Sequence, residues 1–163
     1  MSGLELERKW LVSKLPDEVL SVRADAIEQG YLAVEAGGGE VRLRRREGRC
    51  FITVKSGSGM VRRELEVELS PEQFDALWPG TEGRRVEKSR RVVALAHTPG
   101  GLQVELDEYS GALAGLRVAE VEFADEATAR SFSAPAWFGA EVTDRDEYRN
   151  RSLATRGRPA TGP

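Results

Sequence analysis

The sequence predicts an α+β protein built on an antiparallel β-sheet that has charged residues on one face and apolar residues on the other. Charged residues recur at every second position in several separate segments, which is the period at which side chains return to the same face of a strand. The charges are also sorted by sign, because one of these segments is rich in arginine and others are almost entirely acidic. Residues that favour helix starts lie between some of these segments, so we expect helices to connect some of the strands.

The composition is that of one globular domain with a nearly balanced charge. The chain has 163 residues, of which 31% are charged and 40% hydrophobic, and its net charge is −3. Proteins that bind nucleic acids are usually basic, so we expect no nucleic acid partner. The N-terminal residues contain no apolar run that could form a signal peptide or a membrane span. We therefore expect a cytoplasmic protein, monomeric or homodimeric, without membrane contact, in which the Asn150-Arg151-Ser152 sequon is a coincidence.

The first half of the chain is predicted to form five strands and a short helix. At its start, Glu5, Glu7 and Lys9 share one face of a strand, whereas Trp10 belongs to the apolar face and is expected to pack under a helix. Pro16 suits the first turn of the short helix. Turns rich in glycine separate the later strands, as expected for a meander. The strands are predicted at about residues 5–10, 26–32, 41–46, 50–55 and 62–69.

The second half is predicted to alternate helices with three further strands. Ser70 is expected to cap a helix that has Pro71 at its first position and Gln73 closing a capping box. Asp125 is expected to cap another helix, and a last helix is predicted over 144–153. We therefore predict one domain over residues 1–155, followed by a flexible tail over 156–163. The strands are expected at about residues 88–95, 104–107 and 119–123.

The alternating charges form the candidate site, and they allow two interpretations. One is an antiparallel sheet with a solvated face. The other is a closed barrel with the charges lining its interior and its apolar face covered by surrounding helices. A face that is only solvated usually mixes the two signs along each strand, so the sorted charges favour the barrel. The acids are Glu5, Glu7, Glu64, Glu66, Glu105, Asp107, Glu120 and Glu122, and the bases are Lys9, Arg42, Arg44, Lys55, Arg62, Lys88 and Arg90.

A barrel interior with this composition calls for a ligand of particular chemistry. Unpaired charges cannot be buried in such numbers without exceeding the stability of a domain, so the interior must hold water and a polyanion. Arginine and lysine suit phosphate oxygens, and arginine can bind two oxygens at once. Carboxylates without histidine or cysteine neighbours suit Mg²⁺ or Mn²⁺ better than zinc. The residues themselves thus indicate a complex of metal and polyphosphate.

At this point the sequence resembles a known family, the CYTH domains, which are also called triphosphate tunnel metalloenzymes. The signature of that family is Glu-x-Glu-x-Lys, present here from Glu5 to Lys9. Six further segments follow in the same order, so the resemblance extends from Glu5 to about Leu153. These are Val41-Arg42-Leu43-Arg44, Thr53-Val54-Lys55, Arg62-Arg63-Glu64-Leu65-Glu66, Glu87-Lys88-Ser89-Arg90, Glu105-Leu106-Asp107 and Glu120-Val121-Glu122-Phe123.

The resemblance implies a closed eight-stranded antiparallel β-barrel that forms a tunnel for a triphosphate. The short bacterial members that hydrolyse inorganic triphosphate are the most similar. In them, residues like Lys9 and Tyr31 narrow one end of the tunnel near the C-terminal helix. By position, the resemblance implies phosphate contacts from Arg42, Arg44, Lys55, Arg62, Lys88 and Arg90, divalent metal at Glu5, Glu7, Asp107, Glu120 and Glu122, and an acidic wall that includes Glu64, Glu66 and Glu105.

The implied reaction is hydrolysis of inorganic triphosphate to pyrophosphate and phosphate with Mg²⁺ or Mn²⁺ as cofactor. Glu5 or Glu7 is the candidate acceptor for the proton of the attacking water. Three alternatives stay open: an adenylate cyclase, a nucleoside or thiamine triphosphatase, and a polyphosphate-binding module without turnover. Cyclase members carry a His-Phe pair upstream of the signature, and the four residues before Glu5 do not contain one. The full set of expected acids favours catalysis.

Overall fold

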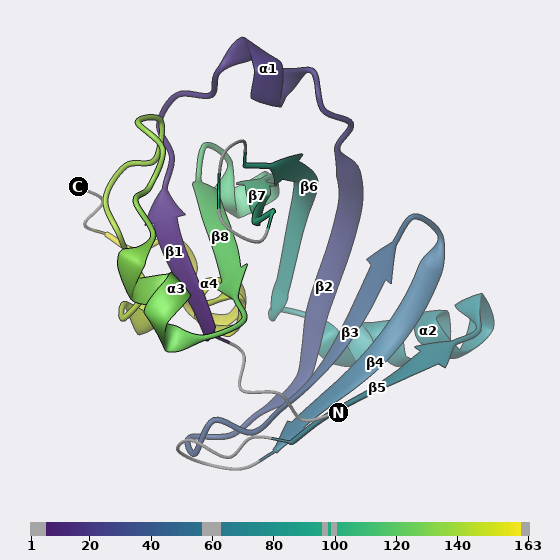
Figure 1. The fold of residues 1–163 in the computed structure, drawn as a ribbon. Helices are drawn as coiled ribbons and strands as arrows, with labels where there is room; N and C mark the ends of the chain where they lie inside the picture. Colours follow the sequence, from purple (N-terminus) through teal and green to yellow (C-terminus); the bar gives the residue numbers. More distant parts are fainter. Residues whose placement is uncertain (1–5, 57–62, 96–97, 99–100, 161–163) are drawn as a thin grey trace.

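The protein folds into one antiparallel sheet of eight strands with short helices around it (Figure 1). The computed structural model describes residues 6–56, 63–95, 98 and 101–160. None of the helices within these parts of the chain is long and apolar enough to cross a membrane. The strands are β1 (Leu6–Leu11), β2 (Asp25–Val34), β3 (Glu40–Arg46), β4 (Arg49–Ser56), β5 (Arg63–Leu69), β6 (Arg85–Ala94), β7 (Gln103–Tyr109) and β8 (Arg117–Phe123).

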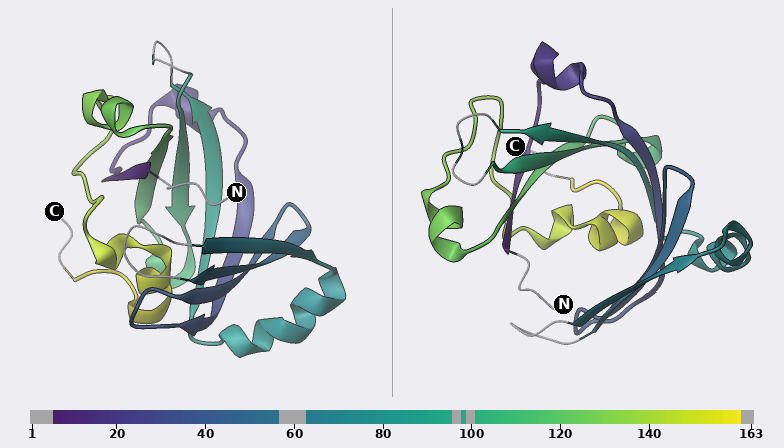
Figure 2. Two further views of the ribbon diagram at one scale, coloured as in Figure 1. Left: turned by 60° about the horizontal axis from the view of Figure 1, so that its bottom comes forward. Right: turned by 45° about the vertical axis from the view of Figure 1, so that its right-hand side comes forward.

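The sheet is strongly curved, so that it has a concave and a convex face (Figure 2). Its strand order is β1-β8-β7-β6-β2-β3-β4-β5, and every neighbouring pair is antiparallel. The register between β2 and β3 shifts between Tyr31 and Ala33, an irregularity that bends and twists a sheet locally. All eight predicted strands are present, and β6 begins three residues before the predicted start at Lys88.

The prediction of a closed barrel is wrong for the described residues, because no hydrogen bonds join β1 to β5. The free edge of β1 is instead covered by residues 139–143, which we call the strap. The amide of Leu11 donates to Ala140 (2.9 Å), and the amides of Gly139 and Val142 donate to Leu11 (2.7 Å) and Lys9 (2.8 Å). The strap thus takes the backbone hydrogen bonds on the edge of β1 with which β5 would have to pair to close a barrel. Covering an exposed strand edge in this way is common in proteins.

A glycine allows this close approach. A side chain at Gly139 would place its Cβ 2.7 Å from the carbonyl oxygen of Leu11, closer than atoms of real side chains come. The hydroxyl of Thr143 extends the pairing by accepting a hydrogen bond from the Lys9 amide (3.0 Å). The strap therefore lies directly against the strand that carries the Glu-x-Glu-x-Lys segment.

The convex face of β1, β7 and β8 is covered by the larger apolar cluster. Trp10 lies at its centre and contacts the rings of Phe132 and Phe138, with centroids 5.6 and 5.0 Å apart. Helix α1 (Asp17–Leu20) contributes Val19, and helix α3 (Glu126–Ser131) lies beside β1 and β8. The predicted position of Trp10, outside the charged face and under a helix, is confirmed.

Helix α2 (Pro71–Leu77) covers β3 and β4 on the convex side, where Phe74 packs on Leu43 and Cys50. The predicted capping box is confirmed, since the Ser70 hydroxyl accepts from the Gln73 amide (3.2 Å) and the Gln73 side chain accepts from the Ser70 amide (2.9 Å). Asp125 caps α3 as predicted. A 3₁₀ turn (Trp78–Thr81) follows α2 directly.

The last helix, α4, differs from the prediction in its bounds and its place. It spans Asn150–Arg156 and not 144–153, because a 3₁₀ turn (Asp146–Tyr148) comes first. It also lies within the curve of the sheet, whereas the barrel prediction put helices around the outside (Figure 2). Its apolar residues join a second cluster on the concave face, formed with Tyr31, Val86, Tyr109, Leu113, Leu116, Val118, Val142 and Tyr148. Arg156, which was predicted to begin the tail, still belongs to the helix.

Candidate active site

The predicted site residues that the structure describes come from all eight strands and share the concave face of the sheet. Their neighbours of opposite parity, such as Leu106, Ala119 and Val121, are buried in the convex clusters, so alternation leaves the charges on the other side. Glu5 and Arg62 lie outside the described residues. The predicted residues that the structure places are Glu7, Lys9, Tyr31, Arg42, Arg44, Lys55, Glu64, Glu66, Lys88, Arg90, Glu105, Asp107, Glu120 and Glu122.

Asp107 is the buried centre of the site. Its side chain is completely inaccessible, and its two oxygens accept hydrogen bonds from Arg90 Nε (2.6 Å), Arg90 Nη2 (2.6 Å) and Lys88 Nζ (2.6 Å). Burial acts to raise the pKa of Asp107, but the two cations outweigh it and the pKa is lowered. In this structure Asp107 therefore holds Lys88 and Arg90 in place, while its predicted role as a metal ligand stays a prediction.

Arg90 connects this centre to two further acids. Its guanidinium pairs with Glu105 and lies 3.6 Å from a carboxylate oxygen of Glu120. Burial acts to lower the pKa of Arg90, but the surrounding carboxylates raise it well above its ordinary value. Arg90 thus stays protonated and neutralises part of the acidic wall.

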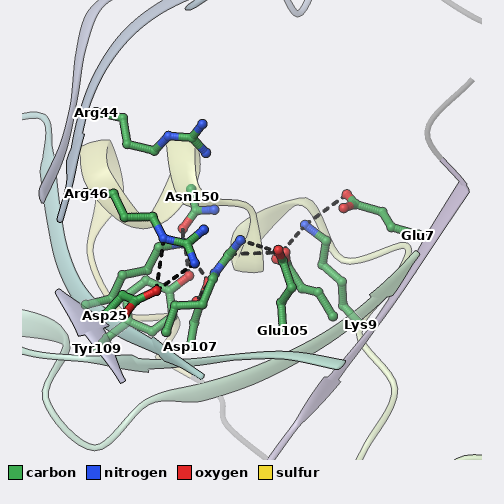
Figure 3. A network of polar contacts seen from close by, with 12 residues as sticks. Glu7, Lys9, Asp25, Arg44, Arg46, Glu105, Asp107, Tyr109 and Asn150 are labelled. Atoms are coloured by element: carbon green, nitrogen blue, oxygen red, sulfur yellow. Dashed lines mark hydrogen bonds and ion pairs between the residues drawn. The ribbon is translucent and has the colours of Figure 1, made fainter. Parts of the chain in front are cut away.

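Lys9 occupies the space between the acids of β1 and β8. Its ammonium lies 3.1 Å from Glu7 and 3.1 Å from Glu120, and Figure 3 shows this network together with Asp107 and Asn150. Burial acts to lower the pKa of Lys9, but Glu120 and Glu7 raise it overall. Glu122 is exposed and stands opposite Glu7 in the strand register.

The strands β3, β4 and β5 form a second wall, which is basic at its centre. Arg42 and Arg44 face the acids of β5, with Arg44 3.0 Å from Glu66 and Arg42 3.7 Å from Glu64. The Nε atoms of both arginines are buried and have no hydrogen-bond partner among the described residues. Burial and repulsion from Arg42 lower the pKa of Arg44. Donors that lack partners, on cations that repel one another, are suited to bind an anion.

Lys55 and Tyr31 complete the predicted set. Lys55 pairs with Glu64 at 2.9 Å. Tyr31 is almost entirely buried, and its hydroxyl accepts a hydrogen bond from Gln29 (2.7 Å). Burial raises the pKa of Tyr31 above its ordinary value, so its hydroxyl remains neutral and can donate a hydrogen bond but does not act as a base.

Four residues that the sequence prediction did not include join the network. Arg46 has the same strand parity as Arg42 and Arg44, and it binds Asp25 at 2.7 Å. That parity alone could have identified Arg46. Asn150, at the start of α4, accepts hydrogen bonds from Tyr109 (2.7 Å) and Lys88 (3.2 Å), and no sequence pattern pointed to it (Figure 3).

The donor types of the acidic wall fit a hard divalent cation. Glu7 stands opposite Glu122, and Glu105 stands opposite Glu120, so two pairs of carboxylates lie across neighbouring strands. Like charges placed opposite each other are unfavourable unless cations lie between them, which Lys9 and Arg90 do here. Within the described parts of the chain, no three acidic, histidine or cysteine side chains form a group that could hold a metal. The acidic wall therefore matches a divalent cation in the type of its ligands, which are carboxylate oxygens in adjacent pairs.

The site can bind a chain of phosphates between its two walls. One wall offers orphaned guanidinium donors, and the other offers Lys88 and Arg90 fixed by Asp107. Such fixed donors can stabilise negative charge that shifts along the phosphate chain during transfer. The acids beside them provide sites for metal or for a proton.

Comparisons with known proteins agree with this chemistry. No family model matches the chain. The chain is 45% identical over 150 residues to the inorganic triphosphatase of Nitrosomonas europaea. This alignment covers 92% of this chain and 96% of the relative. The chain is 33% identical over 154 residues to the inorganic triphosphatase of Acetivibrio thermocellus, covering 93% of each. The crystal structure of the inorganic triphosphatase NE1496 matches with a TM-score of 0.74 and 41% identity, covering 95% of this chain and 97% of that one. The chain therefore belongs to the family of these inorganic triphosphatases.

Proposed function

We propose that this protein hydrolyses inorganic triphosphate to pyrophosphate and phosphate on the concave face of its sheet. The observation that carries this function is the pair of buried Nε donors on Arg42 and Arg44, which have no hydrogen-bond partner among the described residues and share the concave face with Lys88 and Arg90, both fixed by Asp107. Relatives named inorganic triphosphatase, at up to 45% identity over most of the chain, support the same substrate. The eight antiparallel strands and the seven charged segments also support placing the chain among the CYTH domains.

In this proposal the chain's own residues bind and orient the phosphates. Arg42, Arg44 and Lys55 bind from β3 and β4, and Lys88 and Arg90 bind from β6. These cations neutralise the charge that moves to the leaving pyrophosphate as the bond between the terminal phosphorus and the bridging oxygen breaks. Water supplies the oxygen of the released phosphate, and a carboxylate accepts the proton from that water, either Glu7 of β1 or Glu5, which lies outside the described residues.

We propose Mg²⁺ or Mn²⁺ as the cofactor, held by the carboxylates of β1, β7 and β8. When bound, the ion would polarise phosphate oxygens and lower the pKa of a coordinated water. Glu7, Glu120 and Glu122 are the described candidates, because they share the concave face and are more accessible than Asp107. Lys9 would then exchange part of its pairing with Glu7 and Glu120 for phosphate oxygens.

The direct test is phosphate release from tripolyphosphate, ATP and thiamine triphosphate, each with Mg²⁺, Mn²⁺ or EDTA. We expect fast release from tripolyphosphate with either metal, little from the two organic substrates, and none with EDTA. Formation of cyclic AMP and pyrophosphate from ATP would instead identify a cyclase. Tight binding of tripolyphosphate without release would identify a binding module.

Replacing Glu120 and Glu122 together with glutamine tests the metal-binding residues. The change keeps the size of both side chains but removes two anionic oxygen ligands, so we expect the rate with Mg²⁺ to fall at least about a hundredfold. Circular dichroism should show the fold retained, and Glu126→Gln, on the exposed helix α3, should leave the rate unchanged. Unchanged turnover in the double variant would contradict this role for the two acids.

A further inference from the structure

Helix α4 brings one polar side chain into the charged network, and that residue is Asn150. It stands at the first position of the helix, which lies within the curve of the sheet. Its side-chain oxygen accepts hydrogen bonds from the Tyr109 hydroxyl at 2.7 Å and from Lys88 Nζ at 3.2 Å. The contact joins residues 62 positions apart in the chain, and it links the C-terminal helix to a predicted phosphate-binding lysine.

The identity of the contacting atom follows from its two partners. A lysine ammonium has only donors, and the buried Tyr109 hydroxyl stays protonated because burial raises its pKa well above the ordinary value. Both partners therefore need an acceptor, and only the oxygen of the Asn150 amide provides one. The orientation of this amide is fixed from both sides.

The rest of the helix is held in place by apolar packing and by an ion pair with the preceding turn. Leu153 and Ala154 are buried in the concave apolar cluster, together with Tyr148 just before the helix. Arg151 pairs with Asp146 at 2.9 Å on the preceding turn. Asn150 thus extends from a packed element, which is the arrangement that positions a neighbouring group accurately.

We propose that Asn150 is a positioning residue that directs the Lys88 ammonium toward the bound triphosphate. This inference rests on the proposed function. Lys88 has three N–H donors, of which Asp107 Oδ2 takes one at 2.6 Å and Asn150 Oδ1 takes a second. The third has no hydrogen-bond acceptor among the described residues, and in this proposal it donates to a phosphate oxygen. A neutral amide orients the ammonium without cancelling its charge, whereas a second carboxylate at that place would compete with the phosphate for it.

Asn150→Leu tests the proposal, because leucine has a similar size but no acceptor. We expect kcat/KM for tripolyphosphate with Mg²⁺ to fall about tenfold, mainly through KM, since Lys88 would hold the phosphate in both the ground state and the transition state. In a Lys88→Met background the same change should have less than about a twofold effect, because the group through which Asn150 acts is gone. Thr155→Ala, on an exposed position of the same helix, should leave both parameters unchanged.

The two backgrounds separate positioning from a general role in folding. Equal losses from Asn150→Leu in both backgrounds, or no loss in the wild-type background, would overturn the proposal. If turnover of Lys88→Met is too low to measure, the same comparison is made with dissociation constants for tripolyphosphate from titration calorimetry. If Asn150→Leu does not fold, Asn150→Ala removes the same acceptor with a better helix former. An inactive wild-type protein would contradict the proposed function and not this inference alone.

Discussion

The two walls of the concave face are built differently. The first wall, strands β1, β6, β7 and β8, is backed by the large apolar cluster, and its central carboxylate accepts three hydrogen bonds while fully buried. The second wall, strands β3, β4 and β5, has a smaller cluster behind it and buried Nε atoms without partners among the described residues. Its outer strand also exposes Leu65 by 68% and Val67 by 58%.

This difference indicates that the two walls contribute to ligand binding in different ways. The first wall has its charges paired and fixed before a ligand arrives, so it supplies preorganised donors. The second wall keeps donors that only a ligand satisfies, so it has more to gain from binding. The substitutions below test this comparison, beginning with the largest expected effect.

Asp107→Asn should strongly destabilise the folded protein. It removes the negative charge that Lys88 and Arg90 share, and breaking a buried pair costs about 3–5 kcal/mol. Urea unfolding of the wild type and the variant measures the difference. Glu68→Gln, which affects an exposed pair with Arg49, should give no measurable change. Equal stability of Asp107→Asn and the wild type would show that the first wall is not anchored at this residue.

The double change Arg42→Ala with Arg44→Ala should have the opposite profile. Removing two cations that lack full pairing should leave the melting temperature nearly unchanged, while tripolyphosphate affinity falls at least about a hundredfold. Calorimetry and thermal melts measure the two quantities. Arg45→Ala, on the same strand but packed over Phe74 on the convex side, should bind normally. Binding that survives the double change would rule out the second wall as a phosphate site.

Acid should weaken the first wall through Asp107. Because the pKa of this carboxyl is lower in the folded protein than in the unfolded chain, its contribution is fully present above about pH 4. That contribution is lost as the pH falls from there through the lowered, folded-state pKa. The stability difference between the wild type and Asp107→Asn should therefore stay constant above about pH 4 and shrink progressively as the pH falls below it. A difference that stays constant on this further acidification would mean that Asp107 does not titrate as proposed.

Leu65→Ala should have the smallest effect. The side chain is mostly exposed on the convex side of β5, so stability should change by less than about 0.5 kcal/mol and turnover should not change. The same substitution at Leu106, which is fully buried on β7, should cost about 2–5 kcal/mol. Unfolding of both variants measures the contrast. A large loss at Leu65 would show that another part of the molecule covers this strand.

The sequence was informative about the site because alternation sorts side chains by face without help from the rest of the fold. It placed Lys88, Arg90, Glu105 and Asp107 on one face, and the structure agrees. It could not separate Glu105 from Asp107, since both are acids two residues apart on one strand. Only burial and partners distinguish them, because Asp107 is enclosed by two cations while Glu105 remains partly exposed.

The sequence by itself determined the eight strands, the faces on which their charges lie and the helix starts at Ser70 and Asp125, because period-two alternation and capping are local properties of the chain. Only the tertiary structure decided that the sheet stays open beside β1 and that Asn150 reaches Lys88. Both features depend on backbone and side-chain contacts between segments far apart in the chain. A strap that pairs with an edge through Gly139 and Thr143 has no periodic pattern, and a single asparagine carries no local signal of where its helix will pack.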